Sequence, residues 1–252
     1  MAKISIIVLQ YNKSDHTLRC LESLRAFDAD VIVVDNGSEV QHLKNVEFWI
    51  EANEAKSYKL IANSSNLGYS GGNNIGIKYA LEHGAEKILI LNNDVVLEEL
   101  PTGDADIIGV EHGHVFGLSY VSGAVMLVKR EVFEKIGLLD ERYFLYYEDV
   151  EFCVRAQKAG FSLALAKTKF THAVSATTSS LGSANLLYYH TRNALLLLHD
   201  HGTWYQKLGL PIWAFWIMLK QKIKIALGDH FEESQAILDG VKDFRKQKFG
   251  AK

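Results

Sequence analysis

The sequence predicts an α/β fold in which a mostly parallel, Rossmann-like sheet carries helices on both faces. Short apolar runs alternate with helix-compatible segments over the first 95 residues, and they lie at 4–9, 31–34, 59–62 and 87–91. Apolar runs of this length are typical of strands buried on both faces. Their alternation with helices is typical of parallel sheets. Polar clusters follow the second and fourth runs, where such sheets bind ligands.

Length and composition fit one globular domain with a short appendage. The chain has 252 residues, of which 48% are hydrophobic and 23% charged, an ordinary balance for a packed core. The net charge of -3 argues against a nucleic-acid partner, which would favour a basic face. Cys20 and Cys153 lie far apart, so we expect two buried thiols in a reducing compartment and no disulfide.

The ends and apolar runs of the chain bear on its location. A strand is predicted almost at the N-terminus, so we expect no signal peptide. No apolar run reaches 18 residues, so we expect no segment to span a bilayer. The cytoplasm is therefore the expected compartment.

The helices between the first strands begin at recognisable positions. Ser14 or Asp15 is expected to cap the first helix. The second is a charged segment that runs to about residue 55, and the third follows a glycine-rich loop at 66–76 and ends near residue 84. This order completes the β-α-β-α-β-α-β rhythm of the first half.

The second half has a different rhythm, with helices increasingly dominant. Strands are expected over 120–128 and 162–166. Helices are expected over 130–136, 148–160, 186–199, 205–227 and 231–249. We expect three parts: a nucleotide-binding half at 1–95, an acceptor half at 96–200, and a helical extension at 201–252.

Asn92-Asn93-Asp94 directly follows the fourth strand. A carboxylate and amide oxygens in this position can hold Mg²⁺ or Mn²⁺ together with the oxygens of a diphosphate. Asp35 ends the second strand, on the same sheet edge if the strands are parallel, and could accept hydrogen bonds from a nucleoside. The structural alternative for both clusters is a turn, which Asn and Asp favour.

The 66–76 loop is rich in glycine and asparagine. Gly71 and Gly72 permit close approach of the backbone to a ligand, and Asn73 and Asn74 could reach ribose or phosphate at a helix start. The loop matches neither the dinucleotide-binding motif nor the P-loop, which argues against a dehydrogenase and an NTPase. The alternative is a tight helix entry without a ligand.

Glu148-Asp149 opens a predicted helix. Carboxylates at this position are favoured by capping and by the helix dipole. Alternatively, one of them faces the crevice as a general base, which must lie within hydrogen-bond distance of its substrate. The aromatic neighbours, Tyr143, Phe144, Tyr146 and Tyr147, could form a sugar-stacking wall or part of the core.

Taken in order, these segments resemble the inverting family 2 glycosyltransferases with a GT-A fold, over roughly residues 3–200. The resemblance rests on Ile6–Asn12, Val33–Ser38, Asn66–Gly76, Leu91–Asp94, Gly123-Ala124, Gly137–Glu141, Tyr146–Arg155 and Tyr188–Asn193. It implies a GT-A catalytic domain over 1–200. It also implies a divalent metal cofactor, Mg²⁺ or Mn²⁺, and a nucleotide diphosphate sugar donor.

The resemblance also implies roles for individual residues. Asp149, beside Glu148, resembles the catalytic base of the Glu-Asp motif. Asn92 and Asp94 resemble the two ends of the Asp-x-Asp metal motif, with Asn92 in place of the first aspartate, and His172 resembles a late histidine that completes the metal site. The residues expected to hold the donor are Gln10, Tyr11, Asn12, Asp35, Asn66, Gly71, Gly72, Asn73, Asn74 and Asn93.

Within the family, the Glu-Asp and Tyr-Tyr-x-x-Arg-Asn segments most resemble bacterial rhamnosyltransferases that build O-antigen or other cell-surface polysaccharide. This resemblance favours dTDP-L-rhamnose as donor, with a UDP-hexose as the alternative, and a glycan or lipid-linked glycan as acceptor. Segment 97–119 is shorter than the corresponding segment in the usual family layout. Acceptor-binding elements tend to lie there in the family, so the departure affects the expected acceptor site.

Two other functions are compatible with a nucleotide-binding sheet. A sugar-1-phosphate nucleotidyltransferase would carry a glycine-rich basic segment near its N-terminus, where this chain has an apolar strand and Gln10-Tyr11-Asn12. A non-catalytic nucleotide-sugar-binding protein is favoured by Asn92 and disfavoured by the intact Glu148-Asp149.

The segment 208–219 is strongly apolar and is flanked by lysines at 207, 220, 222 and 224. It is too short to span a bilayer, but aromatics and lysines around an apolar stripe suit a helix at a membrane interface. The expected contact would be peripheral, on the inner face of the cell membrane. The alternative is a helix packed on the catalytic domain or in a dimer.

Overall fold

A seven-stranded, mostly parallel sheet forms the centre of the fold, as the sequence predicts. The computed structural model describes residues 3–53, 57–172 and 182–252. β9 runs antiparallel to both of its neighbours, and the other pairings in this sheet are parallel. In spatial order, the strands are β10 (Leu163–Leu165), β6 (Ile107–Gly109), β9 (Val125–Lys129), β4 (Lys87–Asn92), β1 (Ile4–Gln10), β2 (Asp30–Asp35) and β3 (Tyr58–Ala62).

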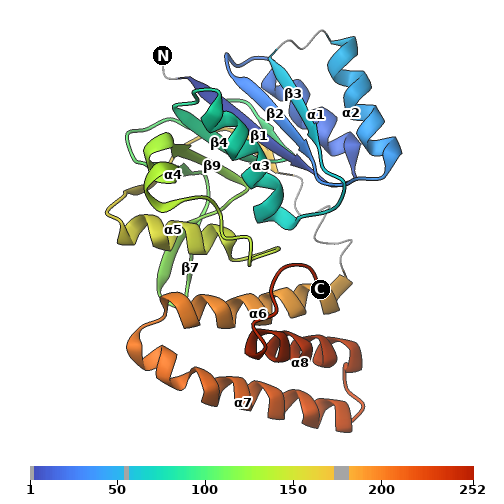
Figure 1. Cartoon of the computed structure of the whole chain (residues 1–252), viewed down its shortest axis with the longest axis vertical. Coiled ribbons are helices and arrows are strands. Elements are labelled where there is room, and N and C mark those ends of the chain that lie inside the picture. The colour runs from blue at the N-terminus through green and yellow to red at the C-terminus, as the bar shows by residue number, and fades with distance from the viewer. Residues whose placement is uncertain (1–2, 54–56, 173–181) are drawn as a thin grey trace.

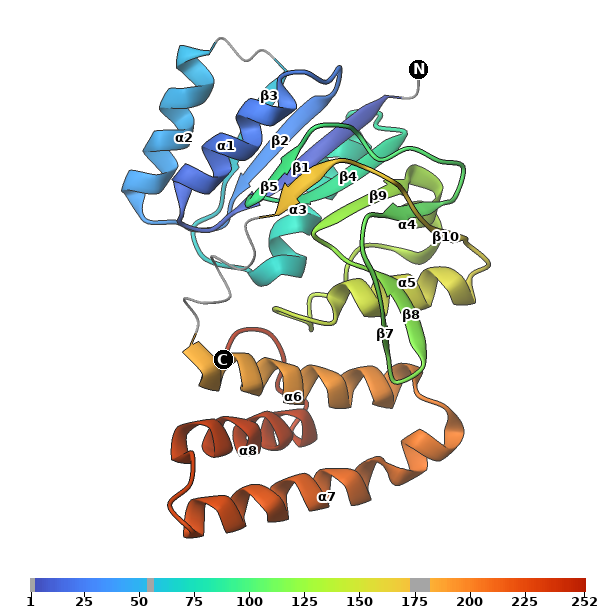
Figure 2. The same ribbon diagram turned by 180° about the vertical axis from the view of Figure 1, so that it is seen from behind.

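Helices cover both faces of this sheet, which confirms the predicted fold class. One face packs on α1 (Ser14–Leu24) and α2 (Val40–Ala52) (Figure 2). The other packs on α3 (Gly68–Glu82), α4 (Arg130–Ile136) and α5 (Glu148–Lys158). Alternate residues of each strand enter opposite cores, which explains why the central residues 6–9 of β1 and 31–34 of β2 are all apolar. Cys20 and Cys153 are buried, unbonded thiols in these two cores, as expected.

The second half differs from its prediction in several short strands. The single strand expected over 120–128 is wrong, because residues 122–124 form a turn between β8 (Leu118–Val121) and β9. β8 forms a hairpin with β7 (His112–Val115), and β5 (Val95–Leu97) pairs with β11 (Phe170–His172). Strands of three or four residues are too short to show a period, so most of them were not predicted. β10 is the exception, since it lies within the strand expected over 162–166.

Two helix starts also differ from expectation. α3 begins at Gly68, inside the predicted loop, so Gly71 to Asn74 are helical. Ser14 does not cap α1: the helix begins after Lys13, and the Ser14 hydroxyl lies 3.0 Å from Nδ1 of His42. The contact with α2 therefore replaces the predicted cap.

A separate layer of three helices lies beside the sheet (Figure 1). It consists of α6 (Gly182–His201), α7 (Trp204–Ala226) and α8 (Phe231–Arg245). α6 packs chiefly on α8, and Leu195, Leu210 and Val241 form a small core between the three. α6 thus groups with the C-terminal extension, although the predicted boundary put it in the acceptor half. Within the described ranges, no helix is long and apolar enough to cross a membrane.

The strand order places the predicted site at a topological switch point. β1 pairs with β2 on one side and β4 on the other, so the chain reverses direction across the sheet there. Gln10 lies directly opposite Asp35, and Leu9 lies opposite Asn92. The carboxyl ends of these three strands meet at one edge, as predicted from the sequence, and open α/β sheets bind ligands at such a crevice.

The close packing of α3 on β1 provides a test of this arrangement. A Cβ on Gly76 would lie 2.6 Å from Cγ2 of Ile7, a buried, β-branched residue. Because such side chains are stiff, we expect Gly76→Ala to lower the free energy of unfolding by about 1–3 kcal/mol. Denaturant unfolding measures this change.

Gly209 in α7 supplies the matched control, since nothing lies within 4 Å of its added Cβ. Gly209→Ala should stabilise the chain by up to about 1 kcal/mol through helix propensity. Equal effects of the two substitutions would contradict the close packing of α3 on the sheet.

Candidate active site

Asp35 and Gln10 form a buried pair at the ends of β2 and β1. Asp35 is 1% exposed, and its Oδ2 accepts a hydrogen bond of 2.8 Å from Nε2 of Gln10. Its Oδ1 accepts one of 3.0 Å from the backbone N–H of Ser38, so the turn suggested as an alternative for Asp35 is present. Oε1 of Gln10 is buried without a hydrogen-bond partner among the described residues. A nucleoside contact for the pair stays a prediction.

Tyr11 and Asn12 directly follow Gln10 at the end of β1. Tyr11 is 39% exposed, so its ring is available to a ligand. Asn12 has a positive φ of 54°, a conformation that asparagine tolerates. Its Oδ1 accepts a hydrogen bond from the N–H of Glu39, and its N–H donates to Ser38. Asn12 therefore joins the end of β1 to the start of α2, and its side chain already has a partner.

Asn36 is the polar residue of this edge that was missed in the sequence. Its Nδ2 donates to Oδ1 of Asn66 and to the carbonyl of Gly68, at 3.0 and 2.9 Å. Its Oδ1 accepts from Asn63 and from the N–H of Leu67. One buried amide thus fixes the entry to α3, and the signal for it was its place beside Asp35 in the turn after β2.

The predicted ligand residues at the start of α3 are buried. A Cβ on Gly72 would lie 2.4 Å from Cδ1 of Leu9, and one on Gly71 would lie 2.9 Å from Cβ of Leu67. Asn74 bonds through both ends of its amide to Leu139, and Asn73 donates to the carbonyl of Tyr69. These contacts correspond to the alternative of a tight helix entry. Ligand contact by these four residues stays a prediction.

Asp94 and His172 face each other across the small β5–β11 sheet. His172 pairs with Val95 in this sheet, which places its Nε2 3.2 Å from Oδ1 of Asp94. The hydrogen bond to Asp94 raises the pKa of His172. The structure therefore brings together two residues that are 78 positions apart and were both predicted as metal ligands.

The rest of the Asn92-Asn93-Asp94 turn has mixed roles. Asn92 ends β4 and is half-buried, whereas Asn93 is 8% exposed and donates a hydrogen bond of 2.9 Å to Oγ1 of Thr17. Asn93 therefore holds the turn against α1, and its contact with a donor stays a prediction. In the described part of the chain, no three His, Cys, Asp or Glu residues form a metal-binding cluster.

Glu148 and Asp149 open α5 after a strained segment. Tyr146 and Tyr147 have φ values of 70° and 73°, which are uncommon for residues other than glycine. Nδ2 of Asn193 in α6 donates to the carbonyls of Leu145 and Tyr146, at 2.9 Å each. The helical layer thus stabilises the backbone that presents the two carboxylates.

Burial changes the acidity of both carboxyl groups. It raises the pKa of Asp149, against hydrogen bonds from the N–H groups of Gly123 and Val150. Burial and the neighbouring Asp149 raise the pKa of Glu148 well above its ordinary value. Oε2 of Glu148 has no hydrogen-bond partner among the residues described. Carboxyl groups with raised pKa values are typical of catalytic acids and bases.

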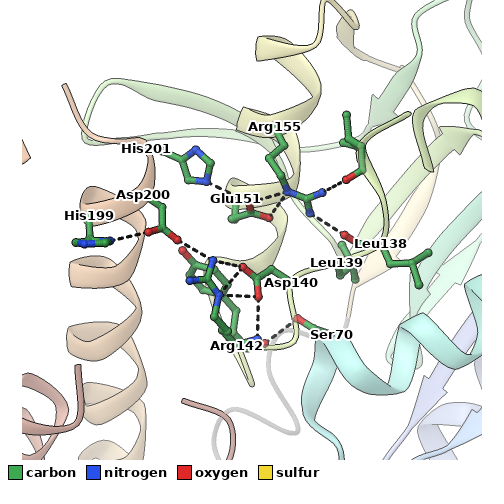
Figure 3. A network of polar contacts seen from close by, with 12 residues as sticks. Ser70, Leu138, Leu139, Asp140, Arg142, Glu151, Arg155, His199, Asp200 and His201 are labelled. Carbon is green, nitrogen blue, oxygen red and sulfur yellow. Dashed lines mark hydrogen bonds and ion pairs between the residues drawn. The ribbon is translucent and has the colours of Figure 1, made fainter. Parts of the chain in front are cut away.

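A polar network beside this segment joins α3, α5 and α6 (Figure 3). Arg155 holds both carboxylate oxygens of Glu151, at 2.7 and 2.9 Å, and donates to the carbonyls of Ile136 and Leu138. Arg142 bridges Asp140 and Asp200, at 2.6 and 2.7 Å. These ion pairs fix the residues that lead into Tyr143, which is fully buried. The core role suggested for Tyr143 is therefore the one observed.

The turn of residues 122–124 connects the two acidic clusters. The N–H of Gly123 donates to Oδ2 of Asp149 at 3.1 Å, and the carbonyl of Ala124 accepts from the N–H of Asn92 at 3.0 Å. The hydroxyl of Tyr69 donates to the carbonyl of Gly123 at 2.6 Å. Burial and then Glu148, Asp149 and Asp94 raise the pKa of Tyr69, so its ring lies among these carboxylates.

Two family models match most of the chain. The model described as Glycosyl transferase family 2 matches residues 5–99, and the one described as Glycosyltransferase like family 2 matches residues 107–193. The chain belongs to the family 2 glycosyltransferases. The first match ends just beyond β5, and the second contains the turn at Gly123, the Glu148-Asp149 pair and most of α6.

Relatives of this glycosyltransferase are named as hexosyl- and rhamnosyltransferases. It is 28% identical to the low-salt glycan biosynthesis hexosyltransferase Agl10 of Haloferax volcanii, over 64% of this chain and 63% of the relative, so it spans under two thirds of that protein. It is 26% identical to the dTDP-rhamnosyl transferase RfbF of Shigella flexneri, over 79% and 81%. It is 31% identical to the N-acetylglucosaminyl-diphospho-decaprenol L-rhamnosyltransferase of Mycobacterium tuberculosis, over 35% and 29%. The resemblance to rhamnosyltransferases is confirmed.

A solved structure shares the fold of the glycosyltransferase. The mannosyltransferase PcManGT from Pyrobaculum calidifontis, in complex with GDP-Man and Mn²⁺, superposes with a TM-score of 0.62 at 13% identity. The superposition covers 98% of this chain and 88% of that one. The GT-A fold predicted from the sequence is confirmed.

Tyr69 offers a test of the turn that joins the two clusters. Tyr69→Phe removes the hydroxyl that holds the Gly123 peptide, and with it a support of Asp149. Because displacing a reacting group by about 1 Å can cost about 100-fold, we expect kcat for sugar transfer to fall by about 10- to 100-fold. The KM for the donor should change little.

Tyr58→Phe is the matched control, since the Tyr58 hydroxyl also donates to a backbone carbonyl, that of Leu21, at 3.0 Å and away from the crevice. Steady-state kinetics with unfolding curves for both variants separate catalysis from stability. A wild-type kcat for Tyr69→Phe would contradict a role in positioning Asp149.

Proposed function

We propose that this glycosyltransferase transfers a sugar, with inversion, from a nucleotide diphosphate donor to a hydroxyl of a glycan or lipid-linked glycan acceptor. The observation that carries the proposal is the pair of hydrogen bonds through which residues 123 and 124 hold Asp149 and Asn92. They keep a carboxylate of raised pKa at a fixed place beside the Asn92–Asp94 turn.

Asp149 is the general base in the proposed reaction. Its carboxylate takes the proton from the acceptor hydroxyl as that oxygen forms a bond to the anomeric carbon. The bond from this carbon to the diphosphate breaks on the opposite side, and the nucleoside diphosphate leaves with the electron pair. One displacement inverts the configuration, and no covalent intermediate with the protein is formed. Glu148 is buried next to Asp149, and its own pKa is raised by burial and by the neighbouring Asp149.

Asp94, His172 and Asn92 fit a site for Mg²⁺ or Mn²⁺. Oδ1 of Asp94 is buried and lies 3.2 Å from Nε2 of His172. A carboxylate oxygen, a histidine nitrogen and an amide oxygen leave coordination positions for a diphosphate and water. When bound, the metal ion supplies positive charge that stabilises the departing diphosphate. Mn²⁺ in the complex of PcManGT supports a divalent ion of this kind.

The donor is proposed as dTDP-L-rhamnose, with a UDP-hexose as the alternative. The names of the Shigella and Mycobacterium relatives support rhamnose. The name of the Mycobacterium relative also supports a lipid-linked acceptor, which would place this chain at the inner face of a membrane. The nucleoside end of the donor is assigned to Gln10, Tyr11 and Asp35, where a buried acceptor oxygen of Gln10 has no hydrogen-bond donor among the described residues.

Thermal shift with a nucleotide panel tests the donor site. We expect dTDP or UDP to raise the melting temperature by about 5–10 °C at about 100 times its dissociation constant, in a metal-dependent manner. GDP, CMP and NAD should have little effect, with and without Mn²⁺. Asp94→Asn should lose the metal-dependent part, whereas Asp104→Asn, at an exposed aspartate, should keep it. No shift with any diphosphate would contradict the proposal.

Asp149→Asn tests the base. The rate of sugar transfer should fall by about 100- to 10,000-fold, the usual contribution of a general base. The nucleotide-dependent thermal shift should be retained. In the wild type, kcat/KM should rise with pH through a midpoint above the ordinary range of about 4 for a carboxyl group, since the raised pKa delays formation of the carboxylate. Wild-type transfer by the variant would mean that another residue is the base.

A further inference from the structure

α7 has two apolar faces, of which one is covered. Its inner face buries Leu210 and Ala214 and packs Ile217 and Met218 into the core shared with α6 and α8. Its outer face carries large exposed side chains along the edge of the molecule, where α7 lies farthest from the sheet (Figure 1). The residues of this outer face are Tyr205, Leu208, Ile212, Phe215, Trp216 and Ile223.

The outer face is a continuous stripe. Residues 205, 208, 212, 216 and 223 recur at the spacing of one helix side. Leu208 is 72%, Ile212 63% and Trp216 60% exposed. Apolar side chains of this size in a contiguous patch mark an interaction surface. Leu227 and Phe231, both exposed, extend the stripe past the end of the helix.

The charges of α7 indicate what covers this face. Between Trp204 and Ala226 the helix has four lysines and no acidic residue, in a chain of net charge -3. At 100° per residue, Lys220 and Lys222 fall on opposite sides of the stripe. Both are exposed and form no ion pair within the described ranges, whereas Lys224 lies 3.9 Å from Asp229.

We propose that the outer face of α7 binds the surface of an anionic lipid bilayer, with the helix lying in the plane of the membrane. Flanking lysines can extend along the apolar stripe and place their ammonium groups among lipid phosphates. Tryptophan and tyrosine rings are favoured at the same depth, because one end of each is apolar and the other polar. A second copy of α7 on this face would bring lysines against lysines, which disfavours a dimer through it.

The β7–β8 hairpin connects this face to the active site. Phe116 at its tip lies 6.0 Å from Trp213 of α7, centroid to centroid. Val115 and Leu118 pack in one cluster with Val150 and Val154 of α5, the helix that begins with Glu148-Asp149. A bilayer against α7 would thus lie near the tip of the hairpin. A lipid-linked acceptor would extend from the membrane there toward Glu148-Asp149. This step rests on the proposed function, whereas bilayer binding does not.

Vesicle sedimentation with the whole chain tests the proposal, without donor or acceptor. Vesicles of phosphatidylcholine with 30% phosphatidylglycerol (about one lipid in three, an anionic fraction in the range that attracts basic segments) should bind the protein. Pure phosphatidylcholine should bind it about tenfold more weakly, and binding to the anionic vesicles should weaken as salt is raised. Tryptophan emission should shift to shorter wavelength on binding.

Matched variants locate the contact. Ile212→Glu should lower binding at least about tenfold, since it places a charge in the apolar stripe. Phe48→Glu makes the same change at a side chain 72% exposed on α2 and should bind as wild type. Lys220→Gln with Lys222→Gln should lower binding to anionic vesicles about tenfold and leave binding to phosphatidylcholine unchanged.

Equal binding by the wild type and Ile212→Glu would overturn the proposal, as would no binding to either vesicle. A concentration-dependent dimer in sedimentation equilibrium that Ile212→Glu abolishes would assign the face to a second copy and would also overturn it. Failure of the proposed function is seen separately, as the lack of a nucleotide-dependent thermal shift in protein free of lipid.

Discussion

Two hydrogen bonds on one short turn hold the acidic clusters of this chain together. The N–H of Gly123 reaches Asp149, and the carbonyl of Ala124 reaches the N–H of Asn92 at the end of β4. The turn lies at this edge because β9 runs antiparallel to β4 and therefore begins beside Leu91, at the carboxyl end of β4. A side chain at Gly123 would crowd the hydroxyl that holds this peptide, since a Cβ there would lie 2.9 Å from the hydroxyl of Tyr69.

This concentration of carboxylates is unfavourable for the protein without its ligands. Burial and mutual repulsion raise the pKa of Glu148, and burial raises that of Asp149. A group whose pKa is raised by folding contributes stability below its unfolded pKa, and this contribution is lost as pH rises through the folded value. The two carboxyl groups therefore make the fold less stable at neutral pH than at acidic pH. A bound cation or a hydroxyl donor would reduce this destabilisation, and the free energy regained would contribute to ligand binding.

The sequence predicted the sheet and its long helices because their apolar patterns extend over enough residues to be recognised. Four apolar runs gave the parallel half, and Asp35 and Asn92 were correctly placed on one edge. It did not predict β5, β6, β7 or β11, which have three or four residues each and depend on distant partners. His172 was singled out by resemblance alone, because its approach to Asp94 depends on the pairing of β5 with β11. Asn36 was missed because its four partners lie some 30 residues away along the chain.

The helical layer supports the candidate active site and also presents a surface. α6 supplies Asn193, which holds the left-handed backbone of Tyr146, and the fully buried Arg192, which reaches the carbonyls of Arg142 and Gly250. The same helix packs on α8 and α7, so the position of Glu148-Asp149 is linked to the layer that carries the exposed outer face. Such a layer orients the catalytic domain on whatever surface covers α7. A strained loop next to the proposed base is therefore supported from the side on which the proposed membrane lies.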